Sequence, residues 1–486
     1  MDRISSYNRK YSLAGYLLLL VLLLPSFVLL ILNGYGEIPS LVSDIRFLKQ
    51  TGLSLALTAA CTLASLILAF PAIAIYARCG TGLRNFLRVF LAFSFCFPPA
   101  LMGICLDTLI GKGGYIAEIQ MATFIRSSVI CLMLNIPLLT VMVGEHWRRL
   151  DSRCENDART LGASRLRIFR TITLPKIRPA LFGASALVFL RCMMAPENPI
   201  ISAFISLVIL AVLVSSEKNI SRTEAPDASY GRKRRGNVFS VFLSFIYMTA
   251  VLALLLGPAC SMILRSVFND GKFSFGIYKT MFSALDLDWL VALGFSLALA
   301  LVSSLIAAFI SVRISVGVSS SGSGTYIAMI PFAAGPLVLA AGLSGVYAWI
   351  EETLAIKMVL TLICHVLILT SVQTMIMLPA VRSVRRTYRE TSLSLGSSSG
   401  RSFRHIDLRI IAPAVRTAVL TSVALSIACH GPAELYGLNT TFAQIQRLSA
   451  KGDIASACAM GSVLLVLCFL FFSLGIGHSR EGKQHA

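Results

Sequence analysis

The sequence predicts an all-α integral membrane protein with about twelve transmembrane helices in two homologous six-helix halves. The chain is 56% hydrophobic and 14% charged, with a mean hydropathy of +0.78. A soluble fold of this composition would lack enough polar residues to cover its surface. Apolar runs of about twenty residues, the length that crosses a bilayer, recur along the chain. Two similar basic segments interrupt these runs, which indicates a duplicated membrane unit.

The first half, residues 1–214, contains four long apolar runs and two short ones. The N-terminal run is longer than the apolar core of a signal peptide, so we expect it to be a spanning helix. The two short runs are separated or interrupted by Arg191, Pro196, Glu197 and Pro199. The six predicted spans are 13–32, 53–76, 89–106, 128–144, 180–194 and 200–213.

The second half, residues 237–486, contains six further apolar runs. They cover residues 238–264, 289–310, 326–350, 355–377, 411–428 and 457–474. Between the halves, residues 215–236 are polar and charged and show no apolar periodicity, so we expect a flexible linker.

The net charge of +20 orients these spans. Lys and Arg concentrate in the two basic segments, in the linker and in short loops that would all lie on one side of the membrane. The positive-inside rule then places these loops and both termini in the cytoplasm. Nucleic-acid binding could also use such charge, but in a chain this apolar the charge more simply orients helices. The twelve cysteines form no CxxC pair or His/Cys cluster, so neither a metal site nor a cofactor is predicted.

The two basic segments are the first repeat segment (residues 155–179, ENDARTLGASRLRIFRTITLPKIRP) and the second repeat segment (residues 389–413, RETSLSLGSSSGRSFRHIDLRIIAP). Leu161-Gly162 aligns with Leu395-Gly396, and Phe169 aligns with Phe403. Every aligned pair has the same separation in the sequence, which we call the repeat interval. A loop that was merely basic would not need the same residues twice. The repetition therefore favours a docking site for a partner.

The residues of the first repeat segment predict two short helices at a sharp angle. Gly162 can end the first helix in the left-handed conformation, and Ser164 is a good N-cap for a second helix through Thr171. Pro179 suits the first turn of the following span. We expect Phe169 and Leu166 to enter an apolar groove of the partner, and the arginines of the segment to meet its acidic groups.

At these residues the chain resembles the EAA loop of bacterial binding-protein-dependent ABC importer permeases. The resemblance implies a type I importer permease fold with EAA loops near residues 150–179 and 384–413. It also implies partners: cytoplasmic ABC ATPase subunits, expected as a homodimer, and a periplasmic or lipid-anchored substrate-binding protein. The location would be the bacterial cytoplasmic membrane. Two loops in one chain resemble the fused permeases of ferric-iron and thiamine importers, which suggests those substrates.

The same resemblance implies which residues couple the chain to the ATPase. These are Asn156, Asp157, Leu161, Gly162, Ala163, Ser164 and Phe169 in the first repeat segment, and Glu390, Leu395, Gly396, Ser397 and Phe403 in the second. The glutamate of the family pattern is Asn156 in the first segment and is kept as Glu390 in the second. Pro175 is replaced by Arg409. We therefore expect the two loops to contribute unequally.

The chain is not predicted to be an enzyme. It has no G-x-x-x-x-G-K-[ST] motif, so ATP hydrolysis would belong to a partner. Ionisable residues near spans are functional candidates; here they include Asp107, His365, Glu351 and Glu352. For His365, we favour the interpretation that its side chain pairs helices. Glu434 and His430, beside Gly431-Pro432, are candidates for the pathway or its gate.

Two other classes compete with this interpretation. An ion-coupled secondary transporter with duplicated halves would place midplane carboxylates at matching positions in both halves, and the sequence shows none. An intramembrane enzyme would need a nucleophile with a base, or a metal-binding set, and no such motif is recognisable.

Overall fold

The structure is a computed structural model that describes residues 2–34, 45–111, 114–116, 122–150, 153–193, 238–269, 272–282, 287–318, 325–384 and 386–477. These residues are helical apart from a short hairpin of β1 (Phe268–Asn269) and β2 (Lys272–Phe273) and the turns between elements. Within them, nine helical segments are long and apolar enough to cross a membrane, or ten if one bent pair counts as a span. The all-α membrane class is confirmed, and the twelve-helix arrangement remains a prediction. The predicted span 200–213 and the linker 215–236 lie outside the described residues.

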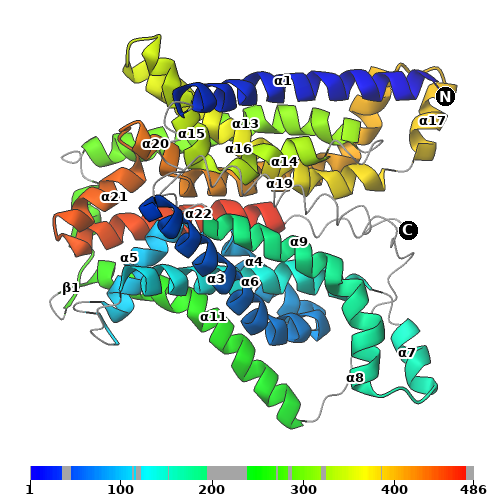
Figure 1. Cartoon of the computed structure of the whole chain (residues 1–486), viewed down its shortest axis with the longest axis horizontal. Helices are drawn as coiled ribbons and strands as arrows, with labels where there is room; N and C mark the ends of the chain where they lie inside the picture. The colour runs from blue at the N-terminus through cyan, green and yellow to red at the C-terminus, as the bar shows by residue number, and fades with distance from the viewer. Residues whose placement is uncertain are drawn as a thin grey trace. The chain divides into compact units, whose positions relative to one another are not determined.

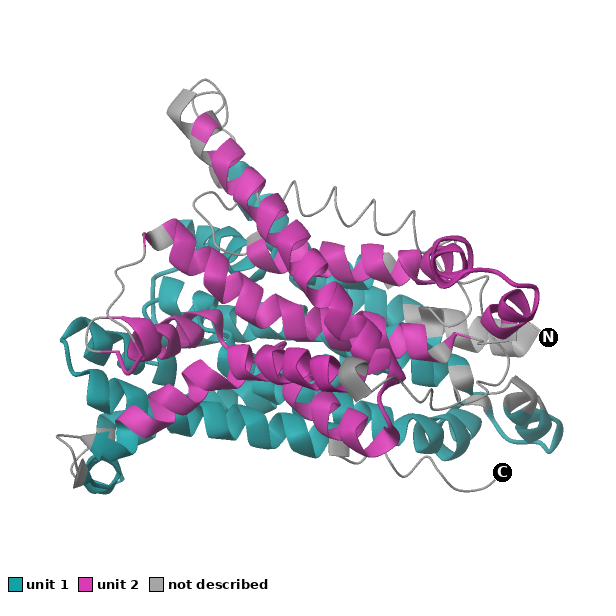
Figure 2. Ribbon diagram, turned by 90° about the horizontal axis from the view of Figure 1, so that it is seen from below, with its two compact units in different colours: residues 1–48, 196–207, 266–486 teal, residues 49–195, 208–265 magenta. Residues whose placement is uncertain are grey.

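The described helices form two compact units (Figures 1 and 2). Unit 2 contains most of α3 (Ile45–Arg78), α4 (Thr81–Phe93), α5 (Pro99–Ile110), α6 (Thr123–Arg149), α7 (Arg153–Thr160), α8 (Arg165–Ile168), the π turn η1 (Phe169–Thr173), α9 (Leu174–Met193) and nearly all of α11 (Val238–Val267).

Unit 1 contains α1 (Asp2–Gly34) and every described element from β1 onward. These are α12 (Gly276–Met281), α13 (Leu287–Val318), α14 (Thr325–Ala334), α15 (Pro336–Ser344), η3 (Gly345–Ala348), α16 (Leu354–Ser383), α17 (Arg386–Ser394), α18 (Ser399–Ser402), the π turn η4 (Phe403–Asp407), α19 (Leu408–Ala428), α20 (Gly431–Leu435), α21 (Thr441–Ala450) and α22 (Ile454–Gly477).

The first helix of each predicted half packs in the unit that is otherwise built from the other half. Helix α1 belongs to unit 1 and lies along α13 (Figure 1). Gly15 brings α1 close to α13, because an added Cβ there would lie 3.0 Å from the Cβ of Arg313. Helix α11 belongs to unit 2, where the Tyr247 hydroxyl donates to the Leu68 carbonyl of α3 at 2.5 Å. The compact units therefore differ from the predicted sequence halves, whose homology remains a prediction.

The third predicted span of each half is broken, which corrects the single helices expected over 89–106 and 326–350. In unit 2, α4 ends at Phe93 and α5 starts at Pro99. In unit 1, α14 and α15 meet at an angle of 86°. Pro99 and Pro336 each occupy the first turn of the second helix, where their missing N–H costs nothing. Gly335, with φ +83°, forms the bend in unit 1.

Small polar side chains join the helices inside unit 1. His365 of α16 lies 2.7 Å from the Ser426 hydroxyl of α19, which confirms that this histidine pairs helices. Gln373 of α16 donates to the Ser304 carbonyl of α13 at 3.0 Å. Such hydrogen bonds hold helices together where lipid and protein are equally apolar.

Candidate functional site

The two repeat segments fold into the same series of elements. Helices α8 and α18, the π turns η1 and η4, and helices α9 and α19 all begin at positions separated by the repeat interval. Each segment lies wholly within its own unit, the first in unit 2 and the second in unit 1. The sequence repeat is therefore also a repeat of local structure.

A left-handed glycine ends the first short helix of each segment, as predicted. Gly162 has φ +80° and Gly396 has φ +83°. The N–H of Ala163 donates to the Ala158 carbonyl at 3.0 Å, and the N–H of Ser397 donates to the Ser392 carbonyl at 3.1 Å. The glycine N–H groups bond three residues back in both segments, to Arg159 and to Leu393. This is the Schellman motif, which reverses the chain sharply after a helix.

The leucine before each glycine extends into solvent at this reversal. Leu161 is 86% exposed and Leu395 is 82% exposed. We call these two side chains the tip leucines. An apolar side chain this exposed, at the same position of two folded loops, is available to fill a pocket in a partner. Leu166, on α8, adds a further apolar side chain that is 61% exposed.

The phenylalanines of the repeat segments turn inward, which corrects the expectation that Phe169 enters a groove of a partner. The Phe169 ring packs edge-on against Phe70 of α3, with centroids 5.8 Å apart, and lies 6.3 Å from Trp147 of α6. Phe403 packs against an apolar cluster that includes Val316 and Ile411. Both rings therefore anchor the short helices to their own unit and hold the tip leucines outward.

Polar contacts fix the first repeat segment further. The Thr173 hydroxyl of η1 donates to Glu155 of α7 at 2.7 Å, and Arg159 lies 3.7 Å from the same carboxylate. Ser164 caps α8 by accepting from the Arg167 N–H, as predicted. Ser398 accepts from the Arg401 N–H in the same way. Sequence reasoning missed Ser398, although it stands one repeat interval after Ser164 and could have been found from it.

The second short helix does not stop at Thr171 as predicted. Helix α8 runs through the π turn η1 directly into α9, and α18 runs through η4 into α19. Helix α9 therefore begins at Leu174, and Pro179 lies inside it, beyond the first turn. In a π turn the backbone N–H bonds five residues back, as Leu174 does to the Phe169 carbonyl. This wider turn lets the chain enter the span without a break.

The remaining predicted coupling residues surround the turns. Asn156 and Asp157 are exposed on α7, and Ala163 and Ser397 are half-buried. Glu390 belongs to α17, and its side chain lies outside the described part of the structure. Several arginines are exposed around both turns and give them a positive surface: Arg159, Arg165, Arg167 and Arg170 in the first segment, and Arg401 and Arg404 in the second.

His430 and Glu434, predicted for the pathway or its gate, come together in unit 1. His430 Nε2 lies 3.9 Å from the Glu434 carboxylate, and the imidazole stacks on Phe442 with centroids 3.9 Å apart. Gly431 places this turn against Leu337 of α15, and the Tyr436 hydroxyl donates to the Ala340 carbonyl at 2.7 Å. The pair therefore lies over the second helix of the broken span.

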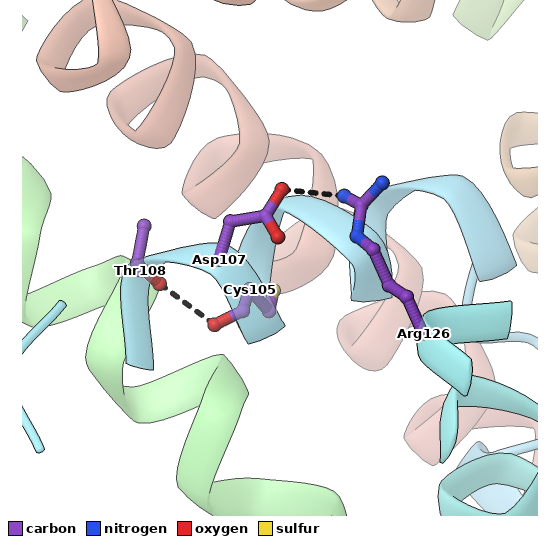
Figure 3. Close-up of polar contacts among 4 residues, drawn as sticks. All are labelled: Cys105, Asp107, Thr108 and Arg126. Carbon is purple, nitrogen blue, oxygen red and sulfur yellow. Dashed lines mark hydrogen bonds and ion pairs between the residues drawn. The ribbon is translucent and has the colours of Figure 1, made fainter. Parts of the chain in front are cut away.

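An ion pair that sequence reasoning did not predict lies in unit 2. Asp107, near the end of α5, contacts Arg126 at the start of α6 (Figure 3). On the other face of α5, the Thr108 hydroxyl lies 2.9 Å from that of Ser261 in α11. Helix α5 is thus tied to both neighbours. Because both ionic side chains are more than one third exposed, the pair contributes little stability by itself.

Comparisons with known proteins identify permeases. The chain is 31% identical over 122 residues to the molybdenum transport system permease protein ModB of Escherichia coli (strain K12), covering 24% of this chain and 53% of that protein. It is 30% identical over 115 residues to the sulfate transport system permease protein CysT of Salmonella typhimurium, covering 22% of this chain and 42% of that protein. The chain thus spans about half the length of these relatives. No family model and no solved structure matches. The similarity supports a permease of a binding-protein-dependent ABC importer.

Proposed function

We propose that this chain is the membrane-spanning permease of an ATP-driven importer and that the two tip leucines dock into separate ATPase subunits. The observation that carries the proposal is the duplicated turn, in which a left-handed glycine presents an exposed leucine beside exposed arginines. Docking would transmit movement of the ATPase through α8 and the π turn into α9, and through α18 into α19. A substrate-binding protein would deliver the solute from the other side of the membrane.

The names of the relatives bear on the substrate. They are permeases for molybdenum and sulfate, and neither name refers to the ferric iron or thiamine suggested by the sequence. Molybdenum is available in water as molybdate, which is a tetrahedral oxyanion like sulfate. We therefore favour a small oxyanion as the substrate of this chain over ferric iron or thiamine.

The proposal is tested by reconstituting the chain in liposomes with candidate ABC ATPase and binding-protein subunits from the same organism. Uptake of labelled sulfate or molybdate should require ATP on the side of the membrane that carries the ATPase, and the chain should stimulate ATP hydrolysis. An ion-coupled secondary transporter would instead take up solute without the ATPase when a proton or sodium gradient is imposed. That result would replace the proposed function.

The two repeat segments are expected to contribute unequally to docking. The predicted position of Glu390 at the start of its helix is wrong, because α17 begins at Arg386 and Glu390 lies beyond the first turn. A carboxylate there can still pair with a basic group of the ATPase. Asn156 carries no charge. We expect Glu390→Ala to weaken ATPase binding by about 1 kcal/mol or more relative to Asn156→Ala. Pull-down of the ATPase across salt concentrations measures this difference. Equal losses, or a loss at Glu390 that salt does not alter, would show that the charge is incidental.

The proposed orientation places both termini and residues 215–236 in the cytoplasm. A single cysteine introduced at Ser229 in a cysteine-free background should react in intact cells only with a membrane-permeant maleimide. A cysteine at Ser274, which follows β2, should react with an impermeant reagent and serves as the matched control. Reaction of both with the impermeant reagent would contradict the orientation.

A further inference from the structure

A charged side chain lies inside unit 2 at the break in the third span. Arg191 is near the end of α9, within the candidate span Arg165–Cys192. Its Nη2 donates to the Ser94 carbonyl at 2.7 Å and to the Phe97 carbonyl at 3.4 Å. These carbonyls belong to the residues between α4 and α5. The guanidinium therefore turns inward, whereas an arginine near a helix end commonly extends to the membrane surface.

The other amino group of Arg191 has no partner. Nη1 is buried and forms no hydrogen bond. Among the described residues, no carboxylate forms an ion pair with the guanidinium, because each ion pair there joins other residues. Leu425 stands one repeat interval after Arg191, so unit 1 has no corresponding charge at that position. The cation at this position is thus a property of one unit only.

Such a charge is costly where it lies. Removing a cation from water is unfavourable unless a counter-charge and hydrogen bonds compensate. Both carbonyls accept from Nη2 and leave Nη1, with its two N–H groups, as an uncommitted donor. Such a donor suits an oxyanion, because a hydrogen bond from a guanidinium to an anionic oxygen is roughly twice as strong as a neutral one.

We propose that Arg191 is a contact for the transported solute and that the solute is a tetrahedral oxyanion. This inference rests on the proposed transport function. The anion would accept hydrogen bonds from Nη1 when the break between α4 and α5 exposes it. The same charge would repel ferric iron and thiamine, which are cations. Arg191 thereby supplies a physical reason for the substrate class, independent of the names of the relatives.

The test uses the purified full chain in detergent and measures thermal unfolding against sodium molybdate, with sodium chloride at matched ionic strength as reference. A ligand that binds the folded state raises the unfolding temperature in a saturable way. We expect molybdate to do so for the wild type and for Arg178→Gln, a control on the same helix whose exposed arginine lies over Phe182. Arg191→Gln should lose the molybdate effect.

Arg191→Lys keeps the charge, but one ammonium group cannot donate to the two carbonyls and to the anion in the same geometry, so it should need about tenfold more molybdate for half the effect. This variant also tests the inference if Arg191→Gln does not fold. An unchanged molybdate response in either variant, or equal stabilisation of the wild type by chloride, would overturn the inference.

Glu197, a little further along the sequence and outside the described residues, provides a second decisive variant. If the anion is the partner of Arg191, Glu197→Gln should change the molybdate response less than about twofold. A much stronger response would identify that carboxylate as the partner and overturn the inference. Failure of the transport proposal is distinguishable, since it would appear as solute uptake that needs no ATPase, whatever the unfolding temperature does in molybdate.

Discussion

Replacing Leu161 and Leu395 together with aspartate is expected to abolish ATP-driven uptake while the chain remains inserted and folded. Both side chains are more than four-fifths exposed, so neither contributes to the packing of its own unit. Burying a leucine in a partner is worth about 2 kcal/mol, which is roughly thirtyfold in affinity for each loop. Aspartate removes this gain and adds the cost of placing a charge in an apolar pocket. Stimulation of ATP hydrolysis and ATPase pull-down measure the loss.

Two matched controls separate apolar docking from other effects of these substitutions. Leu161→Met with Leu395→Met keeps apolar side chains of similar volume and should retain most of the uptake. Thr160→Asp with Ser394→Asp places the same charges one residue earlier in both loops and should cost much less than the tip variants. If the tip variants transport at the wild-type rate, the docking proposal is wrong. If both pairs of aspartate substitutions reduce uptake equally, the added charge accounts for the effect, and loss of the apolar side chain does not.

Gly342→Leu is expected to be the most destabilising single substitution within unit 1. Gly342 of α15 lies directly against the backbone of α1, where an added Cβ would fall on the Ser26 carbonyl group, 2.8 Å from its carbon and closer still to its oxygen. Backbone cannot rotate away as a side chain can, so α1 must separate from α15. Overpacking of this kind costs about 3 kcal/mol. We expect a lower unfolding temperature for the purified chain and faster proteolysis of α1.

Gly257→Leu is the matched control for this prediction. It lies inside α11, and an added Cβ there would meet nothing within 4 Å. It introduces the same side chain at a helical glycine and should leave the unfolding temperature nearly unchanged. Equal destabilisation by both substitutions would mean that helix propensity or hydrophobicity, and not the contact between α1 and α15, accounts for the effect of Gly342→Leu.

The sequence by itself determined the features that depend on composition and on short-range backbone chemistry. Long apolar runs identify spans because unsatisfied backbone groups cannot enter lipid, and a helix satisfies all of its own. The turns at Gly162 and Gly396 were predictable because glycine adopts a positive φ at little cost. The N-cap at Ser164 was predictable because a serine side chain can accept from the free backbone N–H groups at the start of a helix. Ser398 stands one repeat interval later and could have been predicted in the same way.

Only the tertiary structure decided which helices are neighbours and where side chains point. Lipid and protein interior are equally apolar, so hydrophobicity does not show that α1 packs in unit 1 and α11 in unit 2. That assignment depends on shape, such as the close approach at Gly342. The inward turn of Phe169 likewise depends on Phe70 and Trp147, which are distant in sequence. The orientation of Arg191 depends on carbonyl groups exposed by a break far earlier in the chain, and only folding brings them together.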